Sequence, residues 1–120
     1  MNNESSLKSQ TKFRRKYPRR SFQRKLGILF GGRYWMATGG EIGEGGLSFV
    51  LGQNLPEGRE IVVNFQIPGG EFVSVQSEIK NIRKDATTGR TIYGISFKTL
   101  KFEAKREIRA FVSSKIELAG

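Results

Sequence analysis

The chain has 120 residues with a net charge of +10, and its 37% hydrophobic and 27% charged residues fit one globular domain. It contains no cysteine and no histidine, which excludes disulfides, thiol nucleophiles, Ser-His-Asp triads and the common zinc or haem ligand sets. No segment reaches the roughly 18–20 apolar residues that span a bilayer, and the N-terminus has no apolar signal core, so we expect a cytoplasmic protein without a membrane span.

The positive charge is concentrated at the N-terminus. Residues 1–25 hold nine Lys and Arg residues against one acid, whereas residues 26–120 hold twelve against ten. The sequence is therefore a basic arm attached to a nearly neutral body. Such an arm attracts phosphate groups, whether they belong to a nucleotide, a nucleic acid or an anionic membrane.

The basic arm divides into two parts. Residues 1–12 are polar apart from one leucine and one methionine, which predicts a disordered leader. Residues 13–20 are strongly basic, and Pro18 disfavours a helix there because the residue before a proline is pushed to extended geometry. We expect an ordered or semi-ordered loop in this part, with Arg20 and Arg24 facing solvent.

The middle of the chain alternates short segments of strand character with turn signals. Gly31 and Gly32 indicate a two-residue hairpin turn, and the glycine-rich stretch 39–46 indicates a loop. The predicted strands cover residues 22–30, 33–38, 47–51, 61–67, 72–83 and 91–97.

The C-terminal segment has a different period. Ala104, Ile108, Phe111 and Val112 recur at helical spacing, which predicts a helix over 101–116. Six short antiparallel strands followed by one helix favour a mainly all-β fold. We predict a small six-stranded barrel whose open end is covered by the helix, within one domain that spans residues 13–116.

Three motifs occur in a characteristic order along this pattern. The basic loop contains Arg-x-x-x-Arg as Arg15 to Arg19, the glycine-rich stretch contains Glu41 to Gly46 followed by a leucine, and Gly94-Ile95-Ser96-Phe97 precedes the helix. This arrangement resembles the PilZ domain, a bacterial receptor module for cyclic di-GMP. The resemblance covers residues 13 to about 114 and implies a binding protein.

The second motif departs from the family pattern, which is Asp/Asn-x-Ser-x-x-Gly. Gly46 matches, whereas Glu41 stands in place of Asp or Asn and Gly43 in place of Ser. Carried over residue by residue, the resemblance implies that the ligand site consists of Arg14, Arg15, Arg19, Glu41, Gly43 and Gly46. In the family, an arginine directly before the pair accompanies two intercalated ligand molecules, so Arg14 implies a cyclic di-GMP dimer.

These residue types suit the chemistry of the implied ligand. A guanidinium donates two forked N–H groups to guanine O6 and N7 or to phosphate oxygens, and a carboxylate such as that of Glu41 accepts from guanine N1–H and N2–H. One missing serine hydroxyl costs roughly 0.5–1.5 kcal/mol, whereas each arginine contributes roughly 1.5–3 kcal/mol. We therefore expect the altered motif to weaken binding without abolishing it. No cofactor or metal is implied.

Two other functions stay open at this point. The departures at Glu41 and Gly43 also fit a PilZ domain that has lost its nucleotide and acts as a protein–protein adaptor in motility or pilus function. Nucleic-acid binding by the basic arm is disfavoured because the arm is short and the body nearly neutral. An enzyme is disfavoured too, since no base, nucleophile or metal set accompanies the carboxylates. Any downstream partner is a protein that the sequence does not identify.

Overall fold

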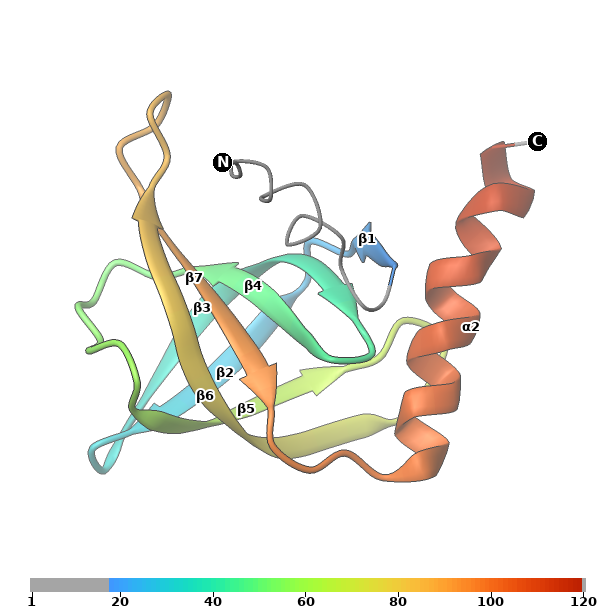
Figure 1. The fold of residues 1–120 in the computed structure, drawn as a ribbon, viewed down its shortest axis with the longest axis horizontal. Helices are drawn as coiled ribbons and strands as arrows, with labels where there is room; N and C mark the ends of the chain where they lie inside the picture. Colours follow the sequence, from blue (N-terminus) through green and yellow to red (C-terminus); the bar gives the residue numbers. More distant parts are fainter. Residues whose placement is uncertain (1–17, 120) are drawn as a thin grey trace, which may run out of the picture.

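The structure is a computed structural model that describes residues 18–119, with side chains described as far as Ser114. The predicted leader at 1–12 and the predicted ligand residues Arg14 and Arg15 lie outside the described residues. The described residues form seven strands and one helix (Figure 1). In chain order these are β1 (Arg19–Ser21), β2 (Lys25–Phe30), β3 (Arg33–Gly43), β4 (Gly46–Val50), β5 (Glu60–Gln66), β6 (Phe72–Lys84), β7 (Thr91–Phe97) and α2 (Phe102–Ala119).

Six of the strands close into an antiparallel barrel. The hydrogen-bonded order is β3-β2-β5-β6-β7-β4, and β4 also pairs with β3, which closes the ring. The short strand β1 is added at the end of β3, with Arg19 opposite Gly43. The predicted mainly all-β fold, a six-stranded antiparallel barrel with a C-terminal helix, is confirmed.

Alternation along the strands fills the barrel. Ile61, Val63 and Phe65 on β5 point inward and are almost fully buried, whereas the residues between them face outward. The turn between β2 and β3 is made by Gly31 and Gly32 at φ values of 60° and 76°. This left-handed geometry is the one that a two-residue hairpin requires and that glycine adopts without strain.

One loop prediction in the N-terminal half was wrong, and a second was wrong in the described residues at its end. The stretch 39–46 is mostly strand, because β3 continues to Gly43 and only Glu44 and Gly45 form the turn. A β-carbon at Gly39 would lie 2.7 Å from the Phe22 ring, so glycine serves close packing there rather than a turn. The predicted arginine loop is likewise extended at its end, since residues 19–21 pair with β3.

The first long strand is shorter than predicted. Residues 22–24 separate β1 from β2, and Gln23 has a φ of 37°, which breaks the extended run. Strand β2 therefore begins at Lys25, where pairing with β3 resumes the barrel wall.

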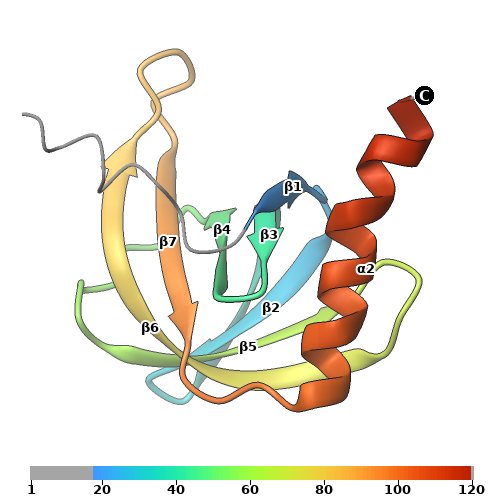
Figure 2. The ribbon, with the colours of Figure 1, turned by 45° about the vertical axis from the view of Figure 1, so that its right-hand side comes forward.

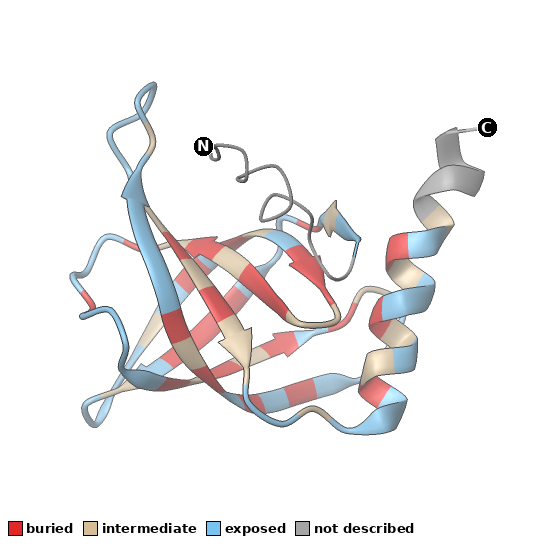
Figure 3. Cartoon of the chain, viewed as in Figure 1, coloured by how far each residue is buried: buried red, intermediate tan, exposed pale blue. Residues whose placement is uncertain are grey.

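Helix α2 lies across one end of the barrel, as predicted. Ala104, Ile108 and Val112 are buried, and Figure 3 shows the buried positions on the side of the helix that faces the strands. The helix begins one residue later and ends three residues later than the predicted 101–116. No helix among the described residues is long and apolar enough to cross a membrane.

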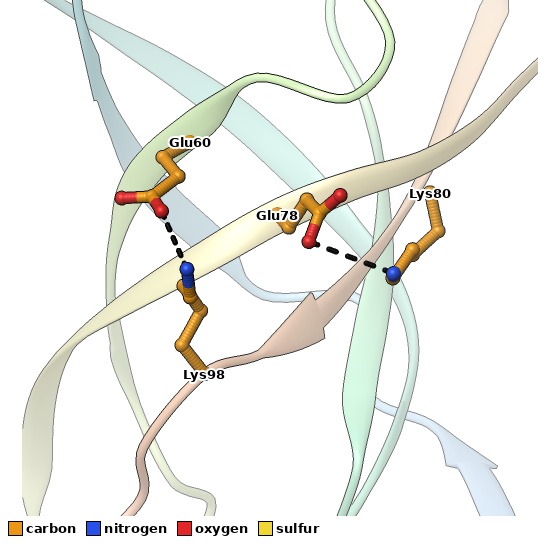
Figure 4. A network of polar contacts seen from close by, with 4 residues as sticks. All are labelled: Glu60, Glu78, Lys80 and Lys98. Atoms are coloured by element: carbon orange, nitrogen blue, oxygen red, sulfur yellow. Dashed lines mark hydrogen bonds and ion pairs between the residues drawn. The ribbon is translucent and has the colours of Figure 1, made fainter.

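Two exposed ion pairs lie on the outer surface of the barrel, formed by residues of β5 and β6 and by the residue that follows β7. Figure 4 shows Lys98 facing Glu60, and Lys80 facing Glu78 at 3.5 Å. Because these side chains are substantially exposed, the pairs contribute little to the free energy of unfolding.

A stronger ion pair joins the β3–β4 turn to the helix. Arg109 donates from Nε and Nη2 to the two carboxylate oxygens of Glu44, at 2.8 and 3.0 Å. The Glu44 side chain is only 11% exposed, whereas Arg109 is 55% exposed. The hydrogen bond from Arg109 lowers the pKa of Glu44, and the positive charges of Arg109 and Lys105 act in the same direction against the effect of burial.

We expect Glu44→Gln to lower the free energy of unfolding by about 0.5–1 kcal/mol near neutral pH, because water screens the exposed side of the pair. A lowered pKa in the folded state stabilises the fold above the ordinary value of 4.5, and this contribution is lost as the pH falls through the folded-state value. Urea unfolding of both proteins at about pH 7 and about pH 3 measures the difference, which should shrink in acid. A gap of equal size at both pH values would contradict the role of this ion pair.

Candidate functional site

A well-formed hollow lies on the outer face of the barrel, over β3, β4, β7 and β6, with β1 at its edge. Its volume is about 460 Å³, which is within the usual range for small-molecule sites. Four predicted ligand residues come together in it, namely Arg19, Glu41, Gly43 and Gly46. Arg14 and Arg15, the other two, lie outside the described residues.

Glycines make the floor of this pocket. A β-carbon at Gly46 would lie 2.0 Å from the carbonyl oxygen of Ile95, so β4 and β7 approach here as only glycine permits. Gly94 on β7 is covered by the Asn81 side chain of β6, and a β-carbon at Gly94 would lie 2.8 Å from the Asn81 amide. At both positions glycine therefore serves close packing at the pocket floor, of the Ile95 backbone against Gly46 and of the Asn81 side chain against Gly94.

Gly43, which stands where the family pattern has serine, is in close contact with β1. A β-carbon there would lie 2.7 Å from the carbonyl oxygen of Pro18 and 3.1 Å from Cγ of Arg19. The glycine thus allows β1 to pair tightly with β3. This pairing holds Arg19 at the edge of the pocket.

Two serine hydroxyls line the pocket although the signature serine is absent. Ser48 on β4 lies opposite Gly94, and Ser96 on β7 lies opposite Gly46. The backbone N–H of Glu41 donates to Oγ of Ser48 at 3.0 Å, which fixes the hydroxyl at the pocket floor. We did not predict either serine as a site residue; the only available signal was the position of Ser48 two residues after the glycine motif.

The opposite wall of the pocket comes from β6, where the sequence analysis placed no site residue. Lys80, Asn81 and Arg83 line this wall. Together with Arg19 the pocket has three cationic side chains against the single carboxylate of Glu41. Its electrostatic character therefore suits an anionic ligand, and its serines and asparagine offer hydrogen bonds to polar base edges.

Arg20 points away from the pocket and contacts the helix. Its Nη1 donates to the carbonyl oxygen of Phe111 at 2.8 Å and to Oγ of Ser114 at 2.9 Å, and its guanidinium lies 4.2 Å from the centre of the Phe111 ring. The prediction that Arg20 faces solvent was wrong, because the sequence does not show that β1 runs beside α2. Figure 2 shows β1 between β3 and the helix.

A closed antiparallel barrel with a helix across one end and a cationic pocket on its outer face defines a small β-barrel domain with a C-terminal helix. The PilZ domain family model matches residues 13–114. The chain therefore belongs to the PilZ domain family, and the resemblance inferred from its motifs is confirmed.

Solved structures agree with this assignment. The Bacillus subtilis inhibitor of motility (MotI/DgrA) has a TM-score of 0.80 at 14% sequence identity, with 88% of this chain and 52% of that chain covered. YcgR from Escherichia coli in complex with c-di-GMP has a TM-score of 0.72 at 14% identity, with 88% of this chain and 47% of that chain covered. At these identities the similarity shows the fold.

The chain spans about half the length of these two structural relatives. The isolated PilZ domain of YcgR from Escherichia coli with c-di-GMP is nearer in size, with 88% of this chain and 94% of that chain covered at a TM-score of 0.66 and 14% identity. No curated protein matches the sequence significantly.

We expect Gly46→Ala to destabilise the fold by about 1–3 kcal/mol, because the new methyl group overlaps the Ile95 carbonyl and must push β4 and β7 apart. Gly52→Ala is the matched control, since open space surrounds Gly52 and its φ is not in the left-handed region. Thermal unfolding of both variants measures the effect. Equal melting temperatures would show that the glycine floor is not a packing requirement.

Proposed function

We propose that this chain is a receptor for cyclic di-GMP and not an enzyme. The supporting observation is that the separated motifs converge: Arg19 from the first signature and Glu41, Gly43 and Gly46 from the second line one cationic pocket. YcgR from Escherichia coli and PlzA from Borreliella burgdorferi, both similar in fold, have been solved with c-di-GMP. A ligand with two phosphates and two guanines matches the charge and the hydrogen-bonding groups of this pocket.

In this proposal each wall residue has a chemical role. Arg19 donates its forked N–H groups to phosphate or to guanine O6 and N7, and Arg14 and Arg15 do the same from the arm. Glu41 accepts from guanine N1–H and N2–H. Ser48 offers the hydroxyl that is missing at Gly43, because its Oγ accepts from the Glu41 backbone and its proton can still be donated to a ligand.

We also propose that each chain binds two intercalated cyclic di-GMP molecules, because Arg14 directly precedes the arginine pair Arg15 and Arg19. Each cyclic di-GMP molecule has two phosphates and two guanine edges, and any of these four groups can accept hydrogen bonds from a guanidinium. The stoichiometry is measured in the same titration as the affinity.

We further propose that ligand binding changes the surface around α2. Two neighbouring residues of β1 connect the pocket with the helix. Arg19 lines the pocket, and Arg20 is hydrogen-bonded to Phe111 and Ser114 of α2. A ligand that pulls on Arg19 therefore acts on the strand that anchors the helix. A partner protein that contacts α2 would detect this change.

The second candidate is a constitutive adaptor that binds no nucleotide. The observation that favours it is the close seating of β1 on Gly43, which already orders residues 19–21 against the barrel. In that case the arm needs no ligand to dock, and the docked surface itself recognises a protein.

Calorimetric titration of the full chain with cyclic di-GMP separates the two candidates. We expect saturable binding to the wild type, an affinity about 10- to 100-fold lower for Arg19→Ala, and no heat for the Arg15→Ala/Arg19→Ala double variant. Arg24→Ala is the control, because Arg24 is exposed and does not line this pocket. A wild-type protein that gives no heat, and whose melting temperature does not change with the ligand, would favour the adaptor.

The coupling to the helix is tested separately with Arg20→Ala. This variant keeps every pocket residue, but it loses two hydrogen bonds and the ring contact that join β1 to α2. We expect ligand-induced shifts of the Phe111 and Ser114 amides in NMR spectra of the wild type, and much smaller shifts in the variant. Shifts of full size in Arg20→Ala would disprove transmission through this contact.

A further inference from the structure

Strand β6 changes the face of its side chains halfway along. Up to Ile79 the odd-numbered residues point into the barrel, and both Ser77 and Ile79 are fully buried. Ile79 pairs with Ile95, but the next partner, Gly94, pairs with Asn81, so Lys80 is an extra residue in a β-bulge.

The bulge reverses the alternation that follows. Without an extra residue, positions 81 and 83 would continue the inward series of 77 and 79. With it, Asn81 and Arg83 turn to the outer face and join Lys80 on the wall of the pocket. Lys84, the next residue, faces away and lines a separate hollow with Leu51 and Arg90.

Of the two cations on this wall, Arg83 is the better placed to bind a ligand. Lys80 lies 3.5 Å from the carboxylate of Glu78, which partly neutralises its positive charge (Figure 4). Arg83 makes no direct ion pair with a carboxylate in the described part of the chain, although the pKa of the nearby Asp85, lowered first by a hydrogen bond from Thr88, is also lowered by the charge of Arg83. Its guanidinium therefore keeps its forked donors available at the pocket wall.

Arg83 and Arg19 belong to the two outermost strands of the pocket. The strands run in the order β1, β3, β4, β7 and β6, as Figure 2 shows from right to left. Four strand spacings of about 4.8 Å would separate β1 from β6 by about 19 Å in a flat sheet, and the curvature of a barrel shortens this span. The two arginines thus approach a bound ligand from opposite sides of the glycine floor.

We propose that Arg83 is a ligand-binding residue of this chain, presented by the β6 bulge and lying outside both signature motifs. It donates a forked pair of N–H groups to phosphate oxygens or to guanine O6 and N7, on the side of the ligand away from Arg19. Asn81 supports this wall by covering Gly94 with its amide. This inference rests on the proposed receptor function.

The test is calorimetric titration with cyclic di-GMP of the full-length wild type, Arg83→Ala, Arg83→Lys and Lys84→Ala. Arg83→Ala should bind about 10- to 100-fold more weakly, the expected effect of losing charge-assisted hydrogen bonds. Arg83→Lys should also be weaker than the wild type, because lysine keeps the charge but lacks the fork. Lys84→Ala removes the same charge from the adjacent position and should change the affinity by less than about threefold, since exposed charges away from the site are screened.

Three results would overturn the inference while leaving the receptor function intact. These are wild-type affinity in Arg83→Ala, wild-type affinity in Arg83→Lys, and an equal loss in Lys84→Ala, which would indicate only a general effect of charge. Absence of binding by the wild type would instead remove the receptor proposal itself. Both residues are exposed near the tip of the β6–β7 hairpin, so unchanged melting temperatures should show that the variants are folded.

Discussion

Strand β3 is the element on which both the barrel and the pocket depend. It has 11 residues, which is more than one partner strand covers. Along one edge it pairs first with β2, from Arg33 to Thr38, and then with β1, from Glu41 to Gly43. Along the other edge it pairs with β4 and closes the barrel. The same strand therefore makes the backbone hydrogen bonds that close the barrel and those that hold Arg19 at the pocket.

Glycine makes this arrangement possible because the strands around the pocket lie unusually close to their neighbours. Phe22 fills the space beside Gly39, the Pro18 carbonyl fills the space beside Gly43, and the Ile95 carbonyl lies against Gly46. In each case a side chain would clash with the group that now fills this space. The glycines of this stretch are thus a packing requirement, whatever their role toward a ligand.

Much of the fold followed from the sequence because its signals are local. The alternation of Ile61, Val63 and Phe65, the Gly31-Gly32 turn and the helical stripe of Ala104 and Ile108 each report their own element, and each was confirmed. The glycine stretch was misjudged because glycines usually mark turns, and their role in close strand contacts depends on residues such as Phe22 and Pro18 that are distant in the chain.

Of the residues that line the pocket, only those at positions of the two family motifs were predicted from the sequence. Arg19, Glu41, Gly43 and Gly46 do line one pocket, although their contacts with a ligand stay proposed. The position of Arg83 on the pocket wall was not predicted, because the direction of its side chain depends on the β-bulge at Lys80, which we did not infer from the sequence. Ser48 was not predicted because its hydroxyl is positioned by a hydrogen bond from the backbone N–H of Glu41, across the β3–β4 turn.

The opposite orientations of Arg19 and Arg20 make the register of β1 decisive. A slip of β1 by a single position along β3 would turn every side chain of β1 to the opposite face, so that Arg19 would leave the face of the pocket and Arg20 would turn toward it. Chemically identical neighbours are in this way given different tasks by backbone pairing alone. Inserting one uncharged residue between Arg19 and Arg20 would place both side chains on the same face of β1, and would abolish this division without altering the charge of the protein.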